Sequence, residues 1–162
     1  MNRVIKFLKD TFPALSRNRV IRYAAGPFIR KYRPSYAQCG EDMILKNILN
    51  KPKGFYIDIG ANNPVSQSNT MYFYKQGWHG INIDATPGAM DKFRKLRKRD
   101  LNIEAAIASE EKEMVFCLFK SSFYNRFENQ SPDKHNDELL GKKLIRTTRL
   151  SGILDQHLPK NN

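Results

Sequence analysis

The chain has 162 residues, of which 40% are apolar and 11% aromatic, so it can build the core of one globular domain. This composition argues against wholesale disorder, and no uncharged apolar run reaches the roughly 18 residues of a membrane-spanning helix. Two cysteines are too few for a disulfide framework or a Cys-based zinc site, and the three histidines lack ligand-like spacing. We therefore expect a reduced, cytoplasmic setting and no metal.

The basic charge is concentrated in two segments. Lys and Arg number 28 against 16 acids, a net charge of +12. Residues 1–33 carry nine basic residues and one acid, and Lys92–Arg99 holds six basic residues in eight positions. The first segment has apolar residues at roughly helical spacing, typical of a basic arm on an anionic membrane surface or an anionic substrate. A solubilising extension is the alternative. We expect an extension at 1–34 and a domain at 35–162.

Helical and strand patterns alternate through the centre of the chain. A helix at 41–50, with a row of apolar residues, precedes the first strand. Helices and strands then follow one another, and this alternation predicts an α/β fold with a parallel sheet and flanking helices. The predicted strands are 55–59, 81–84 and 101–107, and the helices between them are 68–76 and 87–99.

The helix at 87–99 has the clearest boundaries. Thr86 is predicted as its N-cap, with Pro87 in the first helical position. Its buried residues are expected to be Met90, Phe93 and Leu96, and its basic face is expected to be exposed.

The chain beyond residue 107 is less regular. The continuous apolar run Glu113–Phe119 predicts a strand buried on both faces. The polar segment 121–136 is expected to be a loop whose aromatic residues (Phe123, Tyr124 and Phe127) either pack on the sheet, which we favour, or contact a sugar.

Two strand ends carry the candidate chemistry, because ligands of open α/β sheets bind outside the carboxyl ends of the strands. Asp58 is followed by Gly60 and Ala61, where the backbone can turn sharply and admit a ligand. Asp84, 26 residues later, can accept hydrogen bonds from a ribose diol. The pair predicts a nucleoside site, and the absence of G-x-G-x-x-G argues against a nicotinamide dinucleotide.

Each of these residues also has a purely structural interpretation. Asp58 could cap the next helix or pair with a lysine, Gly60 could be a plain turn glycine, and Asp84 could be an ordinary strand-end acid. We expect the Asp84 carboxylate to be solvated, so that its removal changes stability little.

Several motifs together resemble the FkbM-type family of S-adenosylmethionine-dependent methyltransferases. They are SYAQCGEDMIL, GFYIDIGANNPVSQSNTMYFYKQGWHGINIDATP and NIEAAIASEEKEMVFCLF, from about Ser35 to Phe119. The resemblance implies a Rossmann-like methyltransferase fold, S-adenosylmethionine as cofactor, and methylation of a hydroxyl on a sugar or natural-product intermediate. In bacteria, such enzymes often serve surface-polysaccharide pathways.

The resemblance also implies which residues contact the cofactor. The first cofactor loop, the ribose acid, the adenine-lining stretch and an acidic pair upstream all have counterparts in this chain. The upstream pair is Glu41 with Asp42. The implied cofactor-binding residues are Glu41, Asp58, Gly60, Ala61, Asn62, Asp84, Glu104, Ala105 and Ala106. No catalytic residue is identified.

The family continues, after a segment like LSGILDQHL, into a further strand reading roughly F-L-K-I-D-V-E-G. The present chain ends at Asn162, so we expect the methyltransferase sheet to be incomplete at its C-terminus. Two alternatives to an active enzyme follow. One is a truncated, non-catalytic cofactor-binding module, and the other is a basic protein that binds a membrane surface or polyanion. Basic runs without interleaved aromatic residues argue against specific nucleic-acid binding.

Overall fold

The computed structural model describes residues 35–130 and 138–158. The chain divides into two units between Pro34 and Ser35. The basic arm predicted at residues 1–33 lies outside the described residues, so its interaction with anionic surfaces stays a prediction. Within the described ranges, no helix has the length and apolar character needed to cross a membrane.

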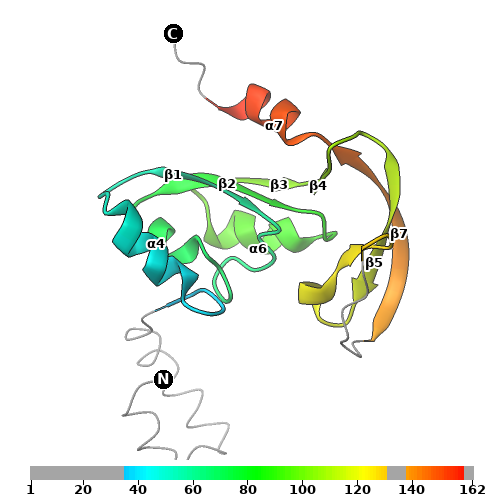
Figure 1. Ribbon diagram of the computed structural model, residues 1–162, viewed down its shortest axis with the longest axis horizontal. Coiled ribbons are helices and arrows are strands. Elements are labelled where there is room, and N and C mark those ends of the chain that lie inside the picture. Colours follow the sequence, from blue (N-terminus) through cyan, green and yellow to red (C-terminus); the bar gives the residue numbers. More distant parts are fainter. Residues whose placement is uncertain (1–34, 131–137, 159–162) are drawn as a thin grey trace, which may run out of the picture. The chain divides into compact units, whose positions relative to one another are not determined.

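A three-stranded parallel sheet forms the first half of the domain (Figure 1). Its strands lie in the order β1-β2-β3, and Ile57 of β1 pairs with Ile81 of β2, which pairs with Leu101 of β3. The alternation of helices and strands confirms the predicted α/β architecture. The elements are α4 (Glu41–Leu49), β1 (Phe55–Ile59), α5 (Met71–Lys75), β2 (His79–Asp84), α6 (Ala89–Leu96) and β3 (Leu101–Glu104).

The start and the exposed face of α6 differ from the prediction. The N-cap is Gly88, in a left-handed conformation with φ of 74°, and not Thr86. Met90 and Phe93 are fully buried as expected, but the Leu96 side chain is 54% exposed. The basic face of the predicted helix at 87–99 is expected to be exposed, yet Arg97 is completely buried. Helical spacing predicted the buried pair correctly and failed where the helix ends, at Leu96.

The third predicted strand is wrong in its length, because the chain leaves the first sheet at Ala105. β3 ends at Glu104, and a second sheet begins with the short strand β4 (Ala106–Ile107). The elements that follow are β5 (Glu113–Phe119), the 3-10 helix η1 (Ser122–Tyr124), β6 (Arg126–Phe127), β7 (Leu139–Thr148) and the helix α7 (Leu150–His157). The second sheet has the order β4-β7-β5-β6, with β4 parallel to β7 and β5 antiparallel to both β6 and β7.

Helices cover both faces of β2, as Figure 1 shows with α6 and α7 on opposite sides of the sheet. On one face, Met90 and Phe93 of α6 pack with Ala61. On the other, Ile153 of α7 packs on Ile81 and Ile83 of β2. Burying one Met, Phe or Ile side chain stabilises the fold by about 1.5–3 kcal/mol. β2 is therefore the central strand, and its carboxyl end lies among the loops that follow β1 and β3.

Candidate functional site

The loop after β1 turns immediately onto the end of β2. The backbone N–H groups of Gly60 and Ala61 both donate to the carbonyl oxygen of Ile83, at 2.9 and 3.1 Å. Gly60 has a φ of 76° and Asn62 a φ of 50°, which are left-handed conformations that glycine and asparagine tolerate best. This turn keeps the loop close to Asp84, the last residue of β2.

The Asp84 carboxylate joins two loops. Its Oδ2 accepts a hydrogen bond from the Asn62 N–H at 2.8 Å, and its Oδ1 accepts one from the Thr86 N–H at 2.7 Å. Asp84 is only 7% exposed, so the expectation of a solvated carboxylate was wrong. Each oxygen keeps a second lone pair, so the carboxylate can still accept hydrogen bonds from a ligand.

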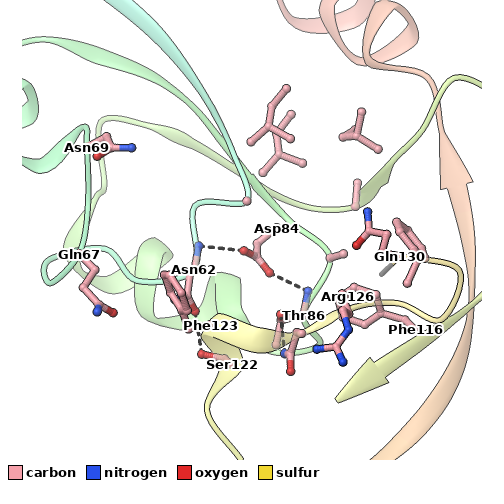
Figure 2. Close-up of a pocket in the computed structure, with 18 of the residues that line it drawn as sticks. Asn62, Gln67, Asn69, Asp84, Thr86, Phe116, Ser122, Phe123, Arg126 and Gln130 are labelled. Atoms are coloured by element: carbon pink, nitrogen blue, oxygen red, sulfur yellow. Dashed lines mark hydrogen bonds between the residues drawn. The ribbon is translucent and has the colours of Figure 1, made fainter. Parts of the chain in front are cut away.

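A cavity of about 440 Å³ lies beside this carboxylate (Figure 2). It brings together five of the residues that the sequence predicted: Glu41, Gly60, Asn62, Asp84 and Ala105. Further lining residues come from the segment before α4, from the loops after β1 and β2, from β5 and from the segment after β5. They include Gln38, Gln67, Asn69, Thr86, Phe116, Ser122, Phe123, Asn125, Arg126, Phe127 and Gln130.

The other four predicted residues lie outside this lining. Ala61 is buried against Met90 and Phe93, and Ala106 is buried in β4. The Glu104 carboxylate accepts a hydrogen bond from the Gly88 N–H at 2.8 Å and so holds the start of α6. Asp58 accepts a hydrogen bond from the Thr70 hydroxyl at 2.9 Å, beneath the loop.

The acidic pair upstream divides into two roles. Asp42 is fully buried, and its carboxylate accepts hydrogen bonds from the Ser35 hydroxyl and the Tyr36 N–H, at 2.6 and 2.7 Å. The Tyr36 carbonyl in turn accepts from the Ser68 N–H at 3.0 Å, which ties this segment to the loop after β1. Glu41, by contrast, lines the cavity.

The segment Ser121–Gln130 forms a second wall of the cavity. The Ser122 hydroxyl donates to the Asn62 side-chain oxygen at 2.7 Å, and the Asn125 amide donates to the Thr86 hydroxyl at 2.9 Å. Sequence reasoning favoured packing for the aromatic residues of this segment. Phe127 does pack edge-on against Phe116, with ring centroids 5.4 Å apart, whereas Phe123 lines the cavity and is 45% exposed.

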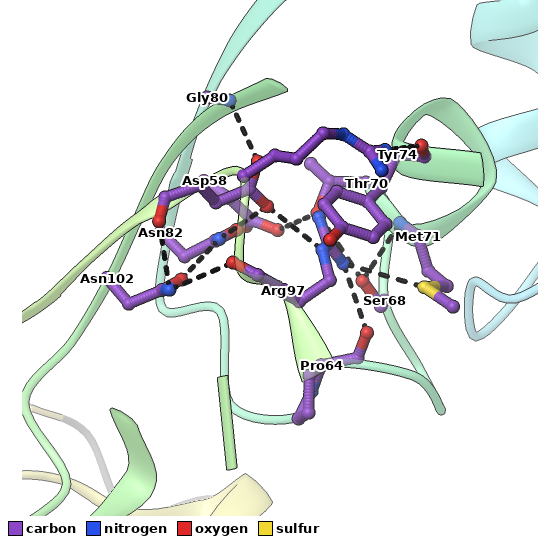
Figure 3. A network of polar contacts seen from close by, with 12 residues as sticks. Asp58, Pro64, Ser68, Thr70, Met71, Tyr74, Gly80, Asn82, Arg97 and Asn102 are labelled. Carbon is purple, nitrogen blue, oxygen red and sulfur yellow. Dashed lines mark hydrogen bonds and ion pairs between the residues drawn. The ribbon is translucent and has the colours of Figure 1, made fainter. Parts of the chain in front are cut away.

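Beneath the loop, the buried guanidinium of Arg97 is surrounded by acceptors (Figure 3). Its Nε lies 2.9 Å from Asp100 Oδ2, and Nη1 donates to the Pro64 carbonyl at 3.0 Å. Nη2 donates to the hydroxyls of Tyr56 and Thr70, at 2.7 and 3.0 Å. Pro64 and Thr70 belong to the loop after β1, so this one side chain fixes that loop from below.

Asp100 completes the network from the other side. Its carboxylate accepts hydrogen bonds from the Tyr56 hydroxyl, the Gly80 N–H and the Asn82 amide, at 2.7, 3.0 and 3.0 Å. Burial is the main cause that raises the pKa of Tyr56, so its hydroxyl stays protonated and donates to Asp100. A buried ion pair is stable only when its remaining donors and acceptors are satisfied, as they are here.

Among the described residues that line the cavity, the charged side chains are the carboxylates of Glu41 and Asp84 and the guanidinium of Arg126. In the described part of the chain, no three His, Cys, Asp or Glu side chains gather as a metal site would need. The cavity therefore offers hydrogen-bonding groups, aromatic rings and both signs of charge.

Replacing Arg97 with methionine should destabilise the fold by about 3–5 kcal/mol, because Asp100 would remain buried without its charge partner. The measurement is urea unfolding followed by circular dichroism. Arg94→Met is the matched control, since Arg94 lies three residues earlier, in α6, with its side chain 54% exposed, and it should change stability by less than about 0.5 kcal/mol. Equal losses of stability from the two substitutions would show that the buried Arg97 stabilises the fold no more than an exposed arginine does.

Replacing Asp84 with alanine should lower the free energy of unfolding by about 1–3 kcal/mol, because two loop N–H groups lose their acceptors. Differential scanning calorimetry of the ligand-free protein tests this. Asp84→Asn keeps one acceptor oxygen and should lower the free energy of unfolding by less than Asp84→Ala does. A melting temperature unchanged by Asp84→Ala would mean that the two loops hold their positions without this carboxylate.

Burial raises the pKa of Asp58 above its ordinary value of 3.8, although the Thr70 hydroxyl and Arg97 act in the opposite direction. Because the pKa is higher in the folded protein, Asp58 stabilises the fold fully below pH 3.8. This contribution is lost as the pH rises through the pKa of Asp58 in the folded protein. The stability of the natural protein relative to Asp58→Asn should therefore fall with rising pH across that window. Urea titrations from about pH 3.5 to 7 measure it, and a difference that grows with pH would contradict it.

Comparison with known proteins agrees with the geometry. No curated protein and no solved structure matches the chain. The profile of the family described as the methyltransferase FkbM domain, however, matches residues 58–162, well over half of the chain. The match contains both strand-end loops and the second wall of the cavity, and it confirms the resemblance inferred from the motifs. The chain belongs to the FkbM methyltransferase domain family.

Proposed function

We propose that this protein is an S-adenosylmethionine-dependent methyltransferase of Rossmann-like fold that methylates a hydroxyl of a sugar or natural-product intermediate. The observation that carries the proposal is the convergence of Gly60 and Asp84 on one cavity at the carboxyl ends of adjacent parallel strands. This is where open α/β sheets bind nucleotides and nucleosides. Family membership supports the reaction class.

The residues present fit the nucleoside part of the cofactor. Asp84 has a free lone pair on each carboxylate oxygen, which suits the two hydroxyls of a ribose. A Cβ added to Gly60 would meet nothing within 4 Å, so the backbone there is open to a ligand. Ala105 and Ile107, which also line the cavity, offer an apolar surface for an adenine ring.

The bound cofactor would supply an electrophilic methyl group on a sulfonium ion. The contribution of the chain is to bind the two reactants and align them, which can account for a large part of such a rate enhancement. Amide side chains recur in the lining of the cavity, beside the exposed aromatic ring of Phe123. This combination suits an acceptor rich in hydroxyl groups. The amides are those of Gln38, Asn62, Gln67, Asn69, Asn125 and Gln130.

A cytoplasmic location is part of the same proposal. Cys39 and Cys117 are both free thiols, one exposed and one buried, which suits a reducing compartment. A non-catalytic cofactor-binding module is the main alternative. Calorimetric titration with S-adenosylmethionine, followed by a search for methyl transfer to sugars, separates the two, because only the enzyme gives both signals.

Replacing Gly60 with alanine should weaken S-adenosylhomocysteine binding by about tenfold or more, because the new methyl group strains a left-handed residue and enters ligand space. Isothermal titration calorimetry measures the change. Gly77→Ala is the matched control: Gly77 has a φ of 92°, its Cβ would also meet nothing within 4 Å, and it lies outside the lining of the cavity.

The control should lose stability to a similar extent and keep its affinity for S-adenosylhomocysteine. Equal affinity of the natural protein and Gly60→Ala would remove this loop from the cofactor site. Failure of the natural protein to bind would count against the proposed function as a whole.

A further inference from the structure

The second wall of the cavity carries one cation in a lining that otherwise has only carboxylates as charged groups. Of the described residues that line the cavity, Arg126 of β6 is the one with a positive charge. This is notable in a chain whose net charge is +12, because most of its basic residues lie elsewhere. In Figure 2, Arg126 lies on the side of Phe116 and Gln130, away from Gln67 and Asn69 of the loop after β1.

Arg126 is held in place by neutral groups. Its guanidinium lies over the ring of Phe119, 4.4 Å from the centroid, and Nη1 donates to the Tyr124 carbonyl at 3.2 Å. These contacts fix the plane of the guanidinium and leave most of its five N–H donors for another acceptor.

Four other cations in or beside the second sheet are paired differently. Lys112, Lys120, Lys142 and Arg146 each form an ion pair with a glutamate. Within residues 35–130 and 138–158, Arg126 has no carboxylate within 4.0 Å. A half-buried guanidinium that lines a cavity without a carboxylate partner suits a ligand that brings its own negative charge.

A flat apolar surface lies next to this cation along the chain. Phe123 lines the same cavity with 45% of its surface exposed, and the Ser122 hydroxyl fixes η1 to the loop after β1. The more deeply buried rings of Phe116 and Phe127, which pack on each other, also line the cavity. The wall therefore combines one oriented cation with one exposed aromatic ring, that of Phe123.

We propose that Arg126 binds an oxyanion, a carboxylate or a phosphate, carried by the acceptor sugar, whose ring lies against Phe123. The acceptor class is then an anionic sugar. This inference rests on the proposed function, because it names the acceptor of the same site. A charge-assisted, two-pronged contact of this kind should favour the anionic sugar by roughly 10- to 100-fold over its neutral counterpart.

The test compares three probes that share one ring: glucose, glucuronate and glucose 6-phosphate. Their affinities are measured by saturation-transfer difference NMR, with and without saturating S-adenosylhomocysteine. The two anions distinguish a carboxylate from a phosphate as the recognised group. The proteins are the natural chain, Arg126→Gln, Arg126→Lys and, as control, Arg146→Gln, which removes an exposed arginine of β7 outside the cavity.

At least one anion should bind the natural protein about tenfold more tightly than glucose does. Arg126→Gln should reduce that preference to within about twofold, Arg126→Lys should keep part of it, and Arg146→Gln should keep all of it. Far-UV circular dichroism verifies that each variant is folded.

Equal affinity for the three sugars, a preference that survives Arg126→Gln, or no anion binding up to about 50 mM would overturn the proposal. So would a loss of S-adenosylhomocysteine affinity in Arg126→Gln as large as the loss for the sugar, because Arg126 would then hold the carboxylate of the cofactor. A natural protein that binds the anions but no S-adenosylhomocysteine would contradict the proposed function and leave the anion site standing.

Discussion

The buried ion pair of Arg97 and Asp100 is the interaction on which the rest of this structure depends. Both side chains are withdrawn from solvent, so every charge and donor must find a partner inside the protein. The partners come from the strands β1 and β2 and from the loop after β1, where Pro64 and Thr70 accept from the guanidinium. A cation at the end of α6 thereby holds one wall of the candidate site.

Asp84 is a second buried carboxylate, and it holds the loop after β1 from the side. Its carboxylate is buried by the two loops whose N–H groups it accepts, those of Asn62 and Thr86. The loop after β1 is thus held from below by a guanidinium and from the side by a carboxylate. A site fixed on both sides before a ligand arrives loses less conformational entropy on binding. The second wall is attached to the same two loops, through Ser122 and Asn125.

Local patterns predicted the strands of the first sheet, apart from the length of the third, and five of the residues that line the cavity. Runs of β-forming residues predicted β1 and β2, and a glycine and an acid at their ends predicted the two residues that meet in the cavity, Gly60 and Asp84. The strand β7 escaped prediction, because lysines and an internal glycine interrupt its apolar pattern and most of it is exposed. It forms a strand by pairing with β5, and that pairing joins residues 20 to 33 positions apart in the sequence.

The parallel α/β order of the first sheet, the strand ends that carry the ligand chemistry and the family could all be predicted from the chain alone, since they depend on residues close together along it. The burial of Arg97, within a run of six basic residues, follows only from packing between distant segments. The same packing places Asp58 beneath the loop and brings Phe123 and Arg126 to the cavity. The reason is physical: whether a charged side chain faces solvent, a partner or a ligand depends on groups that distant segments bring to it, and no local pattern records them.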